Sequence, residues 1–494
     1  EIDRLIEAVL PPRWNPIAQS GAIANTTFLI AAVTGVALLL WYSPSVHKAY
    51  SSLEAMRAAP LTAQLMRSLH RYSSDACILF VVVHALRLTF ARRFTGARWL
   101  AWVTGMFLLG VLWFVGWLGY WLVWDERARQ VALGTAQMLD RVPIFADPLS
   151  RSFLTDGSIN SLLFFMVFFF HMLIPLGMAI PLWLHITRLN RPRFLADRPM
   201  TAWILAALVV LSLVLPAQSA APARMTTVPT AFSLDAWYLL PLLVTDRLGG
   251  LGLWAIMLLG GVVLFLVPWW VARGRAPAAV VDPSKCNACR NCYVDCPYNA
   301  IAMVPRSDGK HFPEEARVDP DKCVGCGICA GSCDSAGVGL PMVSAPEARA
   351  RMDRWIDRML AEGGEPRIAF LCASSAGAGL SVDAATGECS ALPGYSVMAV
   401  ACIGWVHMLT IERAIRHGAK GVLLVACAPS ECTYREGTEW TAQRLRADRA
   451  PELRFAKVPR GSVLLLELDR TNPAALLAAA AAFARGDVAA PAPR

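Results

Sequence analysis

The first 272 residues contain six long apolar stretches separated by polar segments, whereas the rest of the chain mixes apolar and charged residues in ordinary proportions. The stretches cover residues 22–42, 69–91, 99–124, 160–187, 201–217 and 248–271. A helix needs about 20 apolar residues to cross a bilayer. We therefore expect six transmembrane helices, of which the fifth is the shortest. An even number of spans places both ends of this region on one side of the membrane.

The C-terminal part shows a different pattern, in which short apolar strands alternate with helices. The strands are predicted at 367–372, 397–402, 421–427 and 462–468, and the helices at 404–417, 438–448 and 473–485. A polar, charged helix pattern within 341–366 precedes them. This order predicts a small α/β sheet domain.

Composition and charge agree with a membrane protein. The 494 residues are 56% hydrophobic with a net charge of +9, and the mean hydropathy is +0.45. Arginines follow the second, fourth and sixth apolar stretches, at positions Arg87, Arg92, Arg93, Arg98, Arg188, Arg191, Arg193, Arg198, Arg273 and Arg275. The positive-inside rule makes that side cytoplasmic and accounts for the charge without nucleic acid. Residues 1–20 are mixed polar and predict no cleavable signal peptide.

Four of the eight histidines lie in the second and fourth stretches with the same spacing, as His70 and His84, and as His171 and His185. Fourteen residues place each pair on one helix face, about 21 Å apart. Antiparallel helices then pair His70 with His171 and His84 with His185. Two imidazoles on opposite sides of a porphyrin give a haem suited to electron transfer. A packing role is the ordinary alternative, but the repeated spacing favours two b-type haems.

The first and third stretches repeat this spacing in glycines. The pairs are Gly21 with Gly35 and Gly105 with Gly119. Glycine lets a flanking helix come close to a bound haem. Arg67 and Arg87 each lie three residues from a histidine near a membrane edge, where a haem propionate could be bound. Snorkelling towards the lipid headgroups is the open alternative for both arginines.

On these residues, positions 15–272 resemble the cytochrome b family of cytochrome bc and bf complexes. The shared motifs are Arg67-Ser68-Leu69-His70, Trp102-Val103-Thr104-Gly105, Gly119-Tyr120, Trp124-Asp125, Pro143-Ile144 and Trp237-Tyr238-Leu239-Leu240-Pro241. The resemblance implies an outer-face haem at His70 and His171, a cytoplasmic-side haem at His84 and His185, and quinone chemistry.

One departure concerns the family's outer quinol site. The family has Pro-Glu-Trp-Tyr where this chain has Asp235-Ala236-Trp237-Tyr238. Ala236 cannot accept a proton, and Asp235 is left as an open substitute for the glutamate. Outer-face quinol oxidation and transfer to a Rieske protein are therefore in question, and six spans are fewer than the eight of fuller family members.

Cysteines are concentrated in the C-terminal half. Of 14 cysteines, one precedes residue 286. Two runs follow, Cys286-x2-Cys289-x2-Cys292-x3-Cys296 and Cys323-x2-Cys326-x2-Cys329-x3-Cys333. This is two-cluster ferredoxin spacing, in which the fourth cysteine of each run serves the other cluster. We expect one 4Fe–4S cluster on Cys286, Cys289, Cys292 and Cys333, and another on Cys323, Cys326, Cys329 and Cys296. A zinc site, the competing interpretation, does not use this doubled pattern.

Four later cysteines lie at or just after predicted strands, where open α/β sheets place ligands. They are Cys372, Cys402, Cys427 and Cys432. Four thiolates meeting there could bind a 2Fe–2S cluster, and scattered buried thiols are the alternative. Cys389 is a spare or alternative ligand, and Cys77 in the second span is expected to pack.

These residues resemble the delta subunit of methyl-viologen-reducing hydrogenase, with relatives in heterodisulfide-reductase systems. The resemblance rests on Phe370-Leu371-Cys372, on Cys402 before an amphipathic helix, and on residues 421–434 with Cys427-x4-Cys432-x-Tyr434. It implies electron transfer through a 2Fe–2S cluster. Ser375 stands where the family often has a second cysteine.

The sequence thus predicts a multidomain protein: an all-α transmembrane bundle of six spans, a ferredoxin-like domain with two 4Fe–4S clusters, and a small α/β domain. The expected boundaries are 1–272, 273–345 and 346–494. No dinucleotide-binding fingerprint is visible, so substrate chemistry is expected on a partner. That partner is a cytoplasmic dehydrogenase, a flavoprotein or heterodisulfide-reductase-like subunits.

The expected function is an electron-transfer subunit of a respiratory chain in a bacterial inner membrane, with its iron–sulfur domains in the cytoplasm. Electrons would pass from the 2Fe–2S and 4Fe–4S clusters through two haems b to quinone, in a multi-subunit complex that could be dimeric. Quinol oxidation in the manner of cytochrome bc, reverse flow to a cytoplasmic acceptor and a redox sensor remain alternatives.

Overall fold

The structure is a computed structural model of the whole chain, and the placed residues form two compact units. The residues it describes are 14–91, 93–142, 161–187, 193–225, 235, 237–271, 276–341, 344–429, 432–454, 456, 458–459 and 461–487. Several residues of the sequence analysis lie outside these ranges: Arg92, Pro143, Ile144, Arg188, Arg191, Ala236, Arg273 and Arg275. One unit contains almost all of residues 1–272, and the other is built on 273–494.

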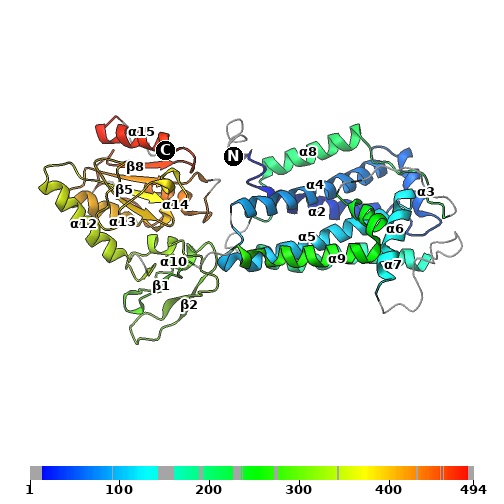
Figure 1. The fold of residues 1–494 in the computed structure, drawn as a ribbon, viewed down its shortest axis with the longest axis horizontal. Helices are drawn as coiled ribbons and strands as arrows, with labels where there is room; N and C mark the ends of the chain where they lie inside the picture. The colour runs from blue at the N-terminus through cyan, green and yellow to red at the C-terminus, as the bar shows by residue number, and fades with distance from the viewer. Residues whose placement is uncertain are drawn as a thin grey trace. The chain divides into compact units, whose positions relative to one another are not determined.

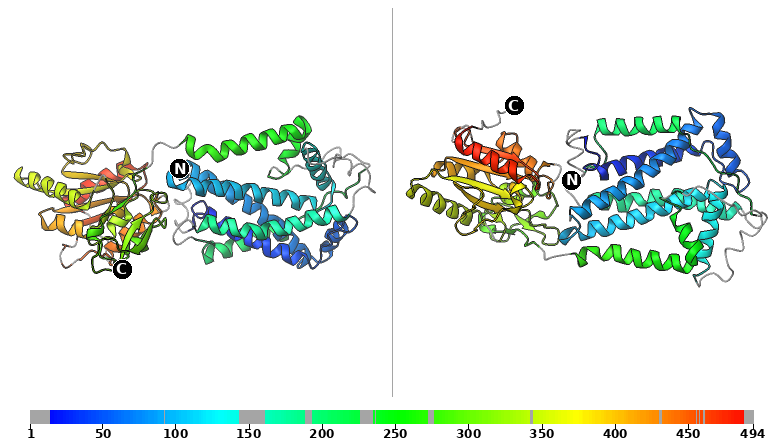
Figure 2. Two further views of the ribbon diagram at one scale, coloured as in Figure 1. Left: turned by 90° about the horizontal axis from the view of Figure 1, so that it is seen from below. Right: turned by 45° about the horizontal axis from the view of Figure 1, so that its top comes forward.

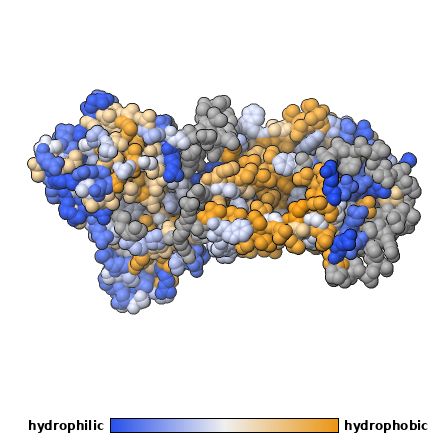
Figure 3. All heavy atoms as spheres, in the orientation of Figure 1, coloured by the Kyte–Doolittle hydropathy of each residue, from blue (hydrophilic) through white to orange (hydrophobic). Residues whose placement is uncertain are grey.

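The N-terminal unit is a bundle of long helices (Figure 1). Among the described residues, five helices are long and apolar enough to cross a membrane. They are α2 (Ser20–Leu38), α4 (Ala63–Phe90), α5 (Trp99–Trp121), α7 (Ser161–Ile186) and α9 (Leu240–Trp270). Their outward side chains are largely leucine, valine, phenylalanine and tryptophan, which gives this unit the hydrophobic surface in Figure 3. Such a surface suits contact with lipid rather than water.

The predicted fifth span corresponds to α8 (Arg198–Val214), a helix of 17 residues. Just before α8, the Ala196 N–H donates to Thr26 Oγ1 of α2 at 3.0 Å. Just after it, the Ala217 N–H donates to Ser68 Oγ near the start of α4, also at 3.0 Å. Helix α8 therefore runs the length of the bundle beside α4, although it is shorter than the other five.

Three features of this unit were not predicted, of which the first is the short helix α3 (Ala49–Ala55). Helix α6 (Glu126–Leu139) follows α5 and is capped by Asp125, whose carboxylate accepts from the Ala128 N–H at 2.9 Å. Helix α9 is broken at Gly249, whose φ of 68° is left-handed, so the predicted span from 248 begins at this break. The sequence analysis missed α6 because it is amphipathic and carries charge on one side, unlike the spans.

The dicluster part of the second unit is a repeated structure. Two antiparallel pairs join β1 (Val280–Val281) to β4 (Val338–Gly339) and β2 (Ile301–Pro305) to β3 (Glu314–Val318). A one-turn helix lies in each cysteine run, α10 (Asn291–Val294) and α11 (Ile328–Gly331). Equivalent positions of the two runs share a positive φ: Ala288 and Gly325, Arg290 and Gly327, Asn299 and Ala336. The two runs thus fold alike.

The C-terminal part is a four-stranded parallel sheet with the order β6-β5-β7-β8. The strands are β5 (Arg367–Cys372), β6 (Tyr395–Val400), β7 (Gly421–Ala426) and β8 (Val463–Glu467). Its helices are α12 (Ala345–Ala361), α13 (Met408–Arg416), α14 (Gly437–Leu445) and α15 (Pro473–Arg485). Figure 2 shows them around the sheet. Each predicted strand and helix is present, with ends that differ by a few residues.

Strand residues alternate between two cores. Phe370 packs in the core that includes α12 and α13, while Leu371 packs in the core that includes α15. This period of two is the one expected for strands covered on both faces.

Packing between α11 and the chain after β6 gives a stability prediction. A Cβ added to Gly331 would lie 2.0 Å from the backbone oxygen of Gly404, whereas one added to Gly339 meets nothing within 4 Å. We expect Gly331→Ala to destabilise the second unit by about 1–3 kcal/mol because backbone must shift. Calorimetry of the detergent-solubilised chain should show a melting point several degrees lower, with Gly339→Ala as the matched control. Equal melting points for the two variants would contradict this packing.

Candidate functional site

The structure brings His70 of α4 and His171 of α7 together. Their ring centroids are 6.1 Å apart and the ring planes are nearly perpendicular, at 82°. A flanking glycine lies against each ring. A Cβ on Gly35 would come within 2.9 Å of His70, and one on Gly119 within 3.0 Å of His171. The two flanking helices can therefore come this close to the rings only if these two positions are glycine.

His84 and His185 are brought together at a second level and interact electrostatically. A Cβ on Gly21 would come within 3.0 Å of the His84 ring, and one on Gly105 within 3.2 Å of the His185 ring. Each of the four predicted glycines thus faces one of the four predicted histidines. The space that a Cβ would fill is the space that close-packed imidazoles need, so these residues fit two bis-histidine haems.

Backbone carbonyls fix the orientation of the first pair. His70 Nδ1 lies 2.8 Å from the Ala31 oxygen, and His171 Nδ1 lies 3.0 Å from the Val115 oxygen. A carbonyl oxygen can only accept, so Nδ1 carries the proton in both rings. Nε2 of a neutral ring is then the atom available to a metal.

A threonine does the same for His185. Thr104 Oγ1 lies 2.9 Å from His185 Nδ1 and donates its own proton to the Leu100 oxygen at 2.8 Å. The hydroxyl oxygen therefore accepts from Nδ1–H, so Nε2 is the unprotonated nitrogen that could bind a metal. Sequence reasoning gave Thr104 no role, although it directly precedes Gly105 in a motif that carried the resemblance.

Arg67 and Arg87 already have protein partners. Arg67 donates to the Leu53 oxygen at 3.2 Å and to Ser219 Oγ at 2.7 Å. Arg87 donates to the Ala18 oxygen at 2.9 Å. Both side chains hold loops at the ends of the bundle, and a propionate contact stays a prediction for each.

Asp235 is held by four hydrogen bonds. One carboxylate oxygen accepts from Arg71 and Tyr120, and the other accepts from the Trp237 N–H at 2.7 Å and the Tyr238 N–H at 3.3 Å. Burial acts to raise the pKa of Asp235, but the bonds from Tyr120 and Arg71 outweigh it and the pKa lies below its usual value. An ionised carboxylate that already accepts four hydrogen bonds is better suited to hold this loop in place than to accept a proton.

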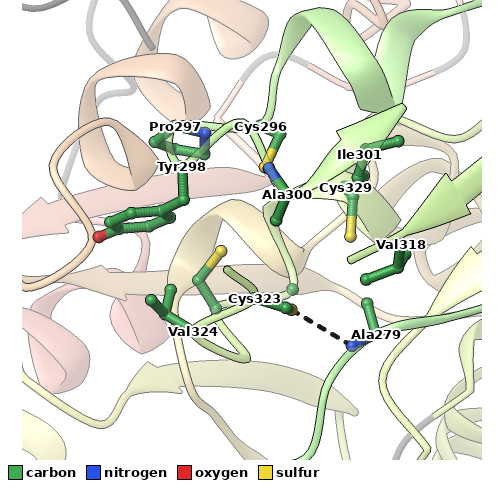
Figure 4. Close-up of a pocket in the computed structure, with 12 residues that line it drawn as sticks. Ala279, Cys296, Pro297, Tyr298, Ala300, Ile301, Val318, Cys323, Val324 and Cys329 are labelled. Carbon is green, nitrogen blue, oxygen red and sulfur yellow. Dashed lines mark hydrogen bonds between the residues drawn. The ribbon is translucent and has the colours of Figure 1, made fainter. Parts of the chain in front are cut away.

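The eight cysteines of the two runs line two cavities. Cavity A is lined by Cys286, Cys289, Cys292 and Cys333. Cavity B is lined by Cys296, Cys323, Cys326 and Cys329, and is drawn in part in Figure 4. The fourth cysteine of each run thus lies with the first three of the other run. Within the described ranges, no three His, Cys, Asp or Glu side chains meet at the distances of a single-ion site.

Most of these thiols are buried, which makes them hard to ionise without a bound metal centre. Cys289 is exposed, but most of the others are buried. Desolvation raises the pKa of Cys292 and of Cys326 to about 12 each. Buried thiols of this kind lose their protons to solvent only when a cationic centre binds the sulfurs. This is the chemistry that iron–sulfur clusters supply.

The four cysteines of the α/β part also converge, and we call them the four-thiol site. Contacts join Cys372 to Cys427, Cys427 to Cys432, and Cys432 to Cys402. All four are at most 2% exposed. A hydrogen bond with Cys427 lowers the pKa of Cys372 to about 7. Hydrogen bonds with Cys402 and Cys427 lower the pKa of Cys432. The four thiols thus form one buried cluster.

The sheet order explains this convergence. The chain goes from β5 to β6 on one side and then returns to β7 on the other side. The crevice where strand order reverses, at the carboxyl ends of β5 and β7, is where open α/β sheets bind ligands. Cys372 ends β5 and Cys427 follows β7. Cys389 packs in the core with α15, whereas Cys372 packs in the core with α13, so the structure separates Cys389 from the four-thiol site.

The four-thiol site adjoins cavity B. Cys402 shares an apolar cluster with Cys326 and Cys329 and interacts electrostatically with Cys326. Tyr434 interacts with Cys326, Cys402 and Cys372. Cavity B in turn adjoins cavity A, because Cys329 interacts with Cys292. The three sites thus follow one another in a single unit.

Three family models match the chain in separate segments. Residues 5–192 match cytochrome b/b6/petB, residues 285–336 match a 4Fe-4S dicluster domain, and residues 368–481 match the delta subunit of methyl-viologen-reducing hydrogenase. The chain thus contains, in this order, segments similar to cytochrome b, to a 4Fe-4S dicluster domain and to the hydrogenase delta subunit. A solved structure titled "Hyperthermophilic respiratory Complex III" is similar at 19% identity and a TM-score of 0.42, over 54% of this chain and 80% of its own.

These matches confirm the predicted resemblances and their order. Together with the apolar helices, the matches support a multi-pass membrane protein for electron transfer, and the cytochrome b match implies haem b. Sequence reasoning missed the acceptors of the histidine Nδ1 atoms. A signal existed for two of them, because Ala31 and Val115 each precede a predicted glycine by four residues, which is one helical turn.

Loss of one glycine should remove one haem from the cytochrome b part. In Gly119→Val, the added side chain would collide with the His171 ring, so we expect the reduced-haem alpha band per chain to fall by about half. Gly110→Val on the same helix is the control, because a Cβ there meets nothing within 4 Å. Full haem content in Gly119→Val would exclude a haem at this level.

The four-thiol site can be tested against the spare cysteine. We expect Cys432→Ser to lose one electron paramagnetic resonance signal of a reduced cluster and about two iron atoms per chain. Cys389→Ser should keep both, because its thiol lies in the other core. Equal iron contents in the two variants would show that no cluster binds at the four-thiol site.

Proposed function

We propose that this chain is the membrane subunit that carries electrons between a cytoplasmic redox partner and the quinone pool. Its cofactors would be two haems b, two 4Fe–4S clusters and one 2Fe–2S cluster, which supply one-electron carriers when bound. The observation that carries the proposal is the adjacency of the three cysteine sites, since Cys292, Cys326, Cys329 and Cys402 pack in one buried cluster. Adjacent sites are what stepwise electron transfer requires.

The ligands follow from the contacts described above. His70 and His171 would hold one haem and His84 and His185 the other, with Nδ1 protons directed to Ala31, Val115 and Thr104. Cavities A and B would hold the 4Fe–4S clusters, and the four-thiol site would hold the 2Fe–2S cluster. The remaining thiol, Cys77, donates to the Ala24 oxygen at 3.3 Å inside the bundle and serves packing.

The topology we propose has six spans, with α8 as the fifth. Helix α8 starts beside the N-terminal end of α2 and finishes beside the N-terminal end of α4, so it connects the two ends of the bundle. Arginines at 87, 93, 98, 193 and 198 then share one side, which the positive-inside rule makes cytoplasmic. We place the domain boundaries at 1–272, 273–345 and 346–494, in a bacterial inner membrane.

The direction we propose is towards quinone, which takes up two electrons and two protons to become quinol. The anchored Asp235 supports this direction, because its carboxylate is committed to Arg71 and Tyr120 and is poorly suited to accept protons from quinol at the outer face. The partner would be a dehydrogenase, a flavoprotein or heterodisulfide-reductase-like subunits, because the chain carries no dinucleotide fingerprint.

Electron transfer can be measured on the full chain in sealed vesicles. A reduced bacterial two-cluster ferredoxin, added outside, should reduce the haems, and the quinone analogue duroquinone should reoxidise them. We expect Cys326→Ser, which lines cavity B, to slow haem reduction at least about tenfold by disrupting one carrier. Cys389→Ser should leave the rate unchanged. Normal haem reduction in Cys326→Ser would remove cavity B from the path, and haems that duroquinone does not oxidise would contradict the quinone link.

A further inference from the structure

A buried arginine lies close to residues of all three cysteine sites. Arg444 of α14 is fully buried. Its Nη2 atom donates to Asp295 Oδ2 and to Ser332 Oγ, each at 2.7 Å. Asp295 directly precedes Cys296 and Ser332 directly precedes Cys333, so they occupy equivalent positions in the two cysteine runs. Arg444 also interacts electrostatically with Cys402 of the four-thiol site.

The charges around Arg444 do not cancel. Among the described residues, Asp295 is the carboxylate that pairs with Arg444, and Arg449 binds the other oxygen of the same carboxylate. Arg449 also stacks on Trp440, with its Cζ 4.1 Å from the ring centroid. Two guanidinium groups thus share one carboxylate in a buried region. A buried charge without a counter-charge costs several kcal/mol, so an anion is expected close by.

Unpartnered donors point to the same conclusion. Nε and Nη1 of Arg444 and Nε1 of Trp405 are buried and have no hydrogen-bond partner within the described part of the chain. Trp405 belongs to the turn η7 (Ile403–Trp405), directly after Cys402. Its ring faces the cavity B run, since a Cβ on Gly327 would lie 2.7 Å from Trp405 Cδ1. Such donors are rarely left unsatisfied in folded proteins.

We propose that Arg444 is an electrostatic tuning residue, and that the missing counter-charge is the anionic iron–sulfur centres of the adjoining sites. This inference rests on the clusters of the proposed function and adds a role for a residue that binds none of them. Net charge and hydrogen bonds to sulfur set the potential of an iron–sulfur centre. A buried positive charge stabilises the more negative, reduced form and raises the midpoint potential. Arg444 would thereby make the soluble unit easier to reduce.

The experiment is a redox titration of the full detergent-solubilised chain, followed by electron paramagnetic resonance. Arg444→Met leaves Asp295 paired with Arg449, so no carboxylate is orphaned. We expect it to lower the midpoint potential of the Cys402-linked centre. Asp295→Asn removes the negative partner and should raise that potential. A tenfold change in the ratio of reduced to oxidised centres corresponds to about 59 mV for one electron, and a shift of that order is expected for Arg444→Met.

Arg446→Met is the matched control. Arg446 lies two residues further along, is 44% exposed, and pairs with Glu439 and Asp448 at the surface. Its removal should leave all potentials unchanged. If Asp295→Asn does not fold, Arg449→Met tests the downward shift a second time, because it removes one positive charge and leaves Arg444 and Asp295 paired.

The outcomes separate the possible roles. Opposite shifts in Arg444→Met and Asp295→Asn support tuning, because a general structural disturbance has no reason to change sign. A lower melting point for Arg444→Met with unchanged potentials would make Arg444 a structural contact only and overturn the proposal. Absence of cluster signals from the unmodified chain would instead contradict the proposed function itself.

Discussion

The N-terminal unit depends on close approach between a histidine ring and a glycine on the facing helix. This contact occurs four times, on two helix pairs and at two levels. Because the spacing is fourteen residues on every helix involved, the contacts on α2 and α4 are in register with those on α5 and α7. Any side chain at the four glycines would push the helices apart at the level where an imidazole has to be held. The period of fourteen is therefore one constraint shared by four helices.

Carbonyl and hydroxyl acceptors complete this arrangement. A neutral imidazole has one protonated nitrogen, and the hydrogen-bond partners that the protein supplies determine which one it is. The oxygens of Ala31, Val115 and Thr104 make that choice at Nδ1. Ala31 and Val115 can do so because they lie one turn before a glycine, on the helix face that approaches the ring. The glycine that permits the approach thus also determines which backbone oxygen reaches Nδ1.

Much of the helix bundle and of the cysteine sites was predictable from the sequence, because these features repeat at short, regular spacings along the chain. The spans follow from apolar runs, the histidine and glycine pairs from a spacing of fourteen, and the cysteine runs from spacings of two and three. A helix was correctly predicted near the fifth stretch, but α8 has 17 residues and is shorter than the five span-length helices among the described residues, so a sixth span stays a prediction. Helix α6 and the break at Gly249 could not be predicted in this way. An amphipathic helix between spans has no apolar run, and a glycine in a span usually serves packing.

The contacts that join the soluble parts lie beyond local patterns. Arg444 and Asp295 are 149 positions apart, and nothing near either residue marks it as half of a buried ion pair. An arginine in an amphipathic helix ordinarily faces solvent, as Arg446 does directly after the end of the same helix. The close approach of α11 to the turn after β6, where a Cβ on Gly331 would meet both the Gly404 oxygen and Arg444 Nη1, contributes to excluding water from Arg444. The burial of this charge therefore follows from backbone packing between the dicluster part and the α/β part, each of which could be recognised alone. A residue of this kind depends on both domains being present, so fusing them in one chain has an electrostatic consequence that neither domain would show by itself.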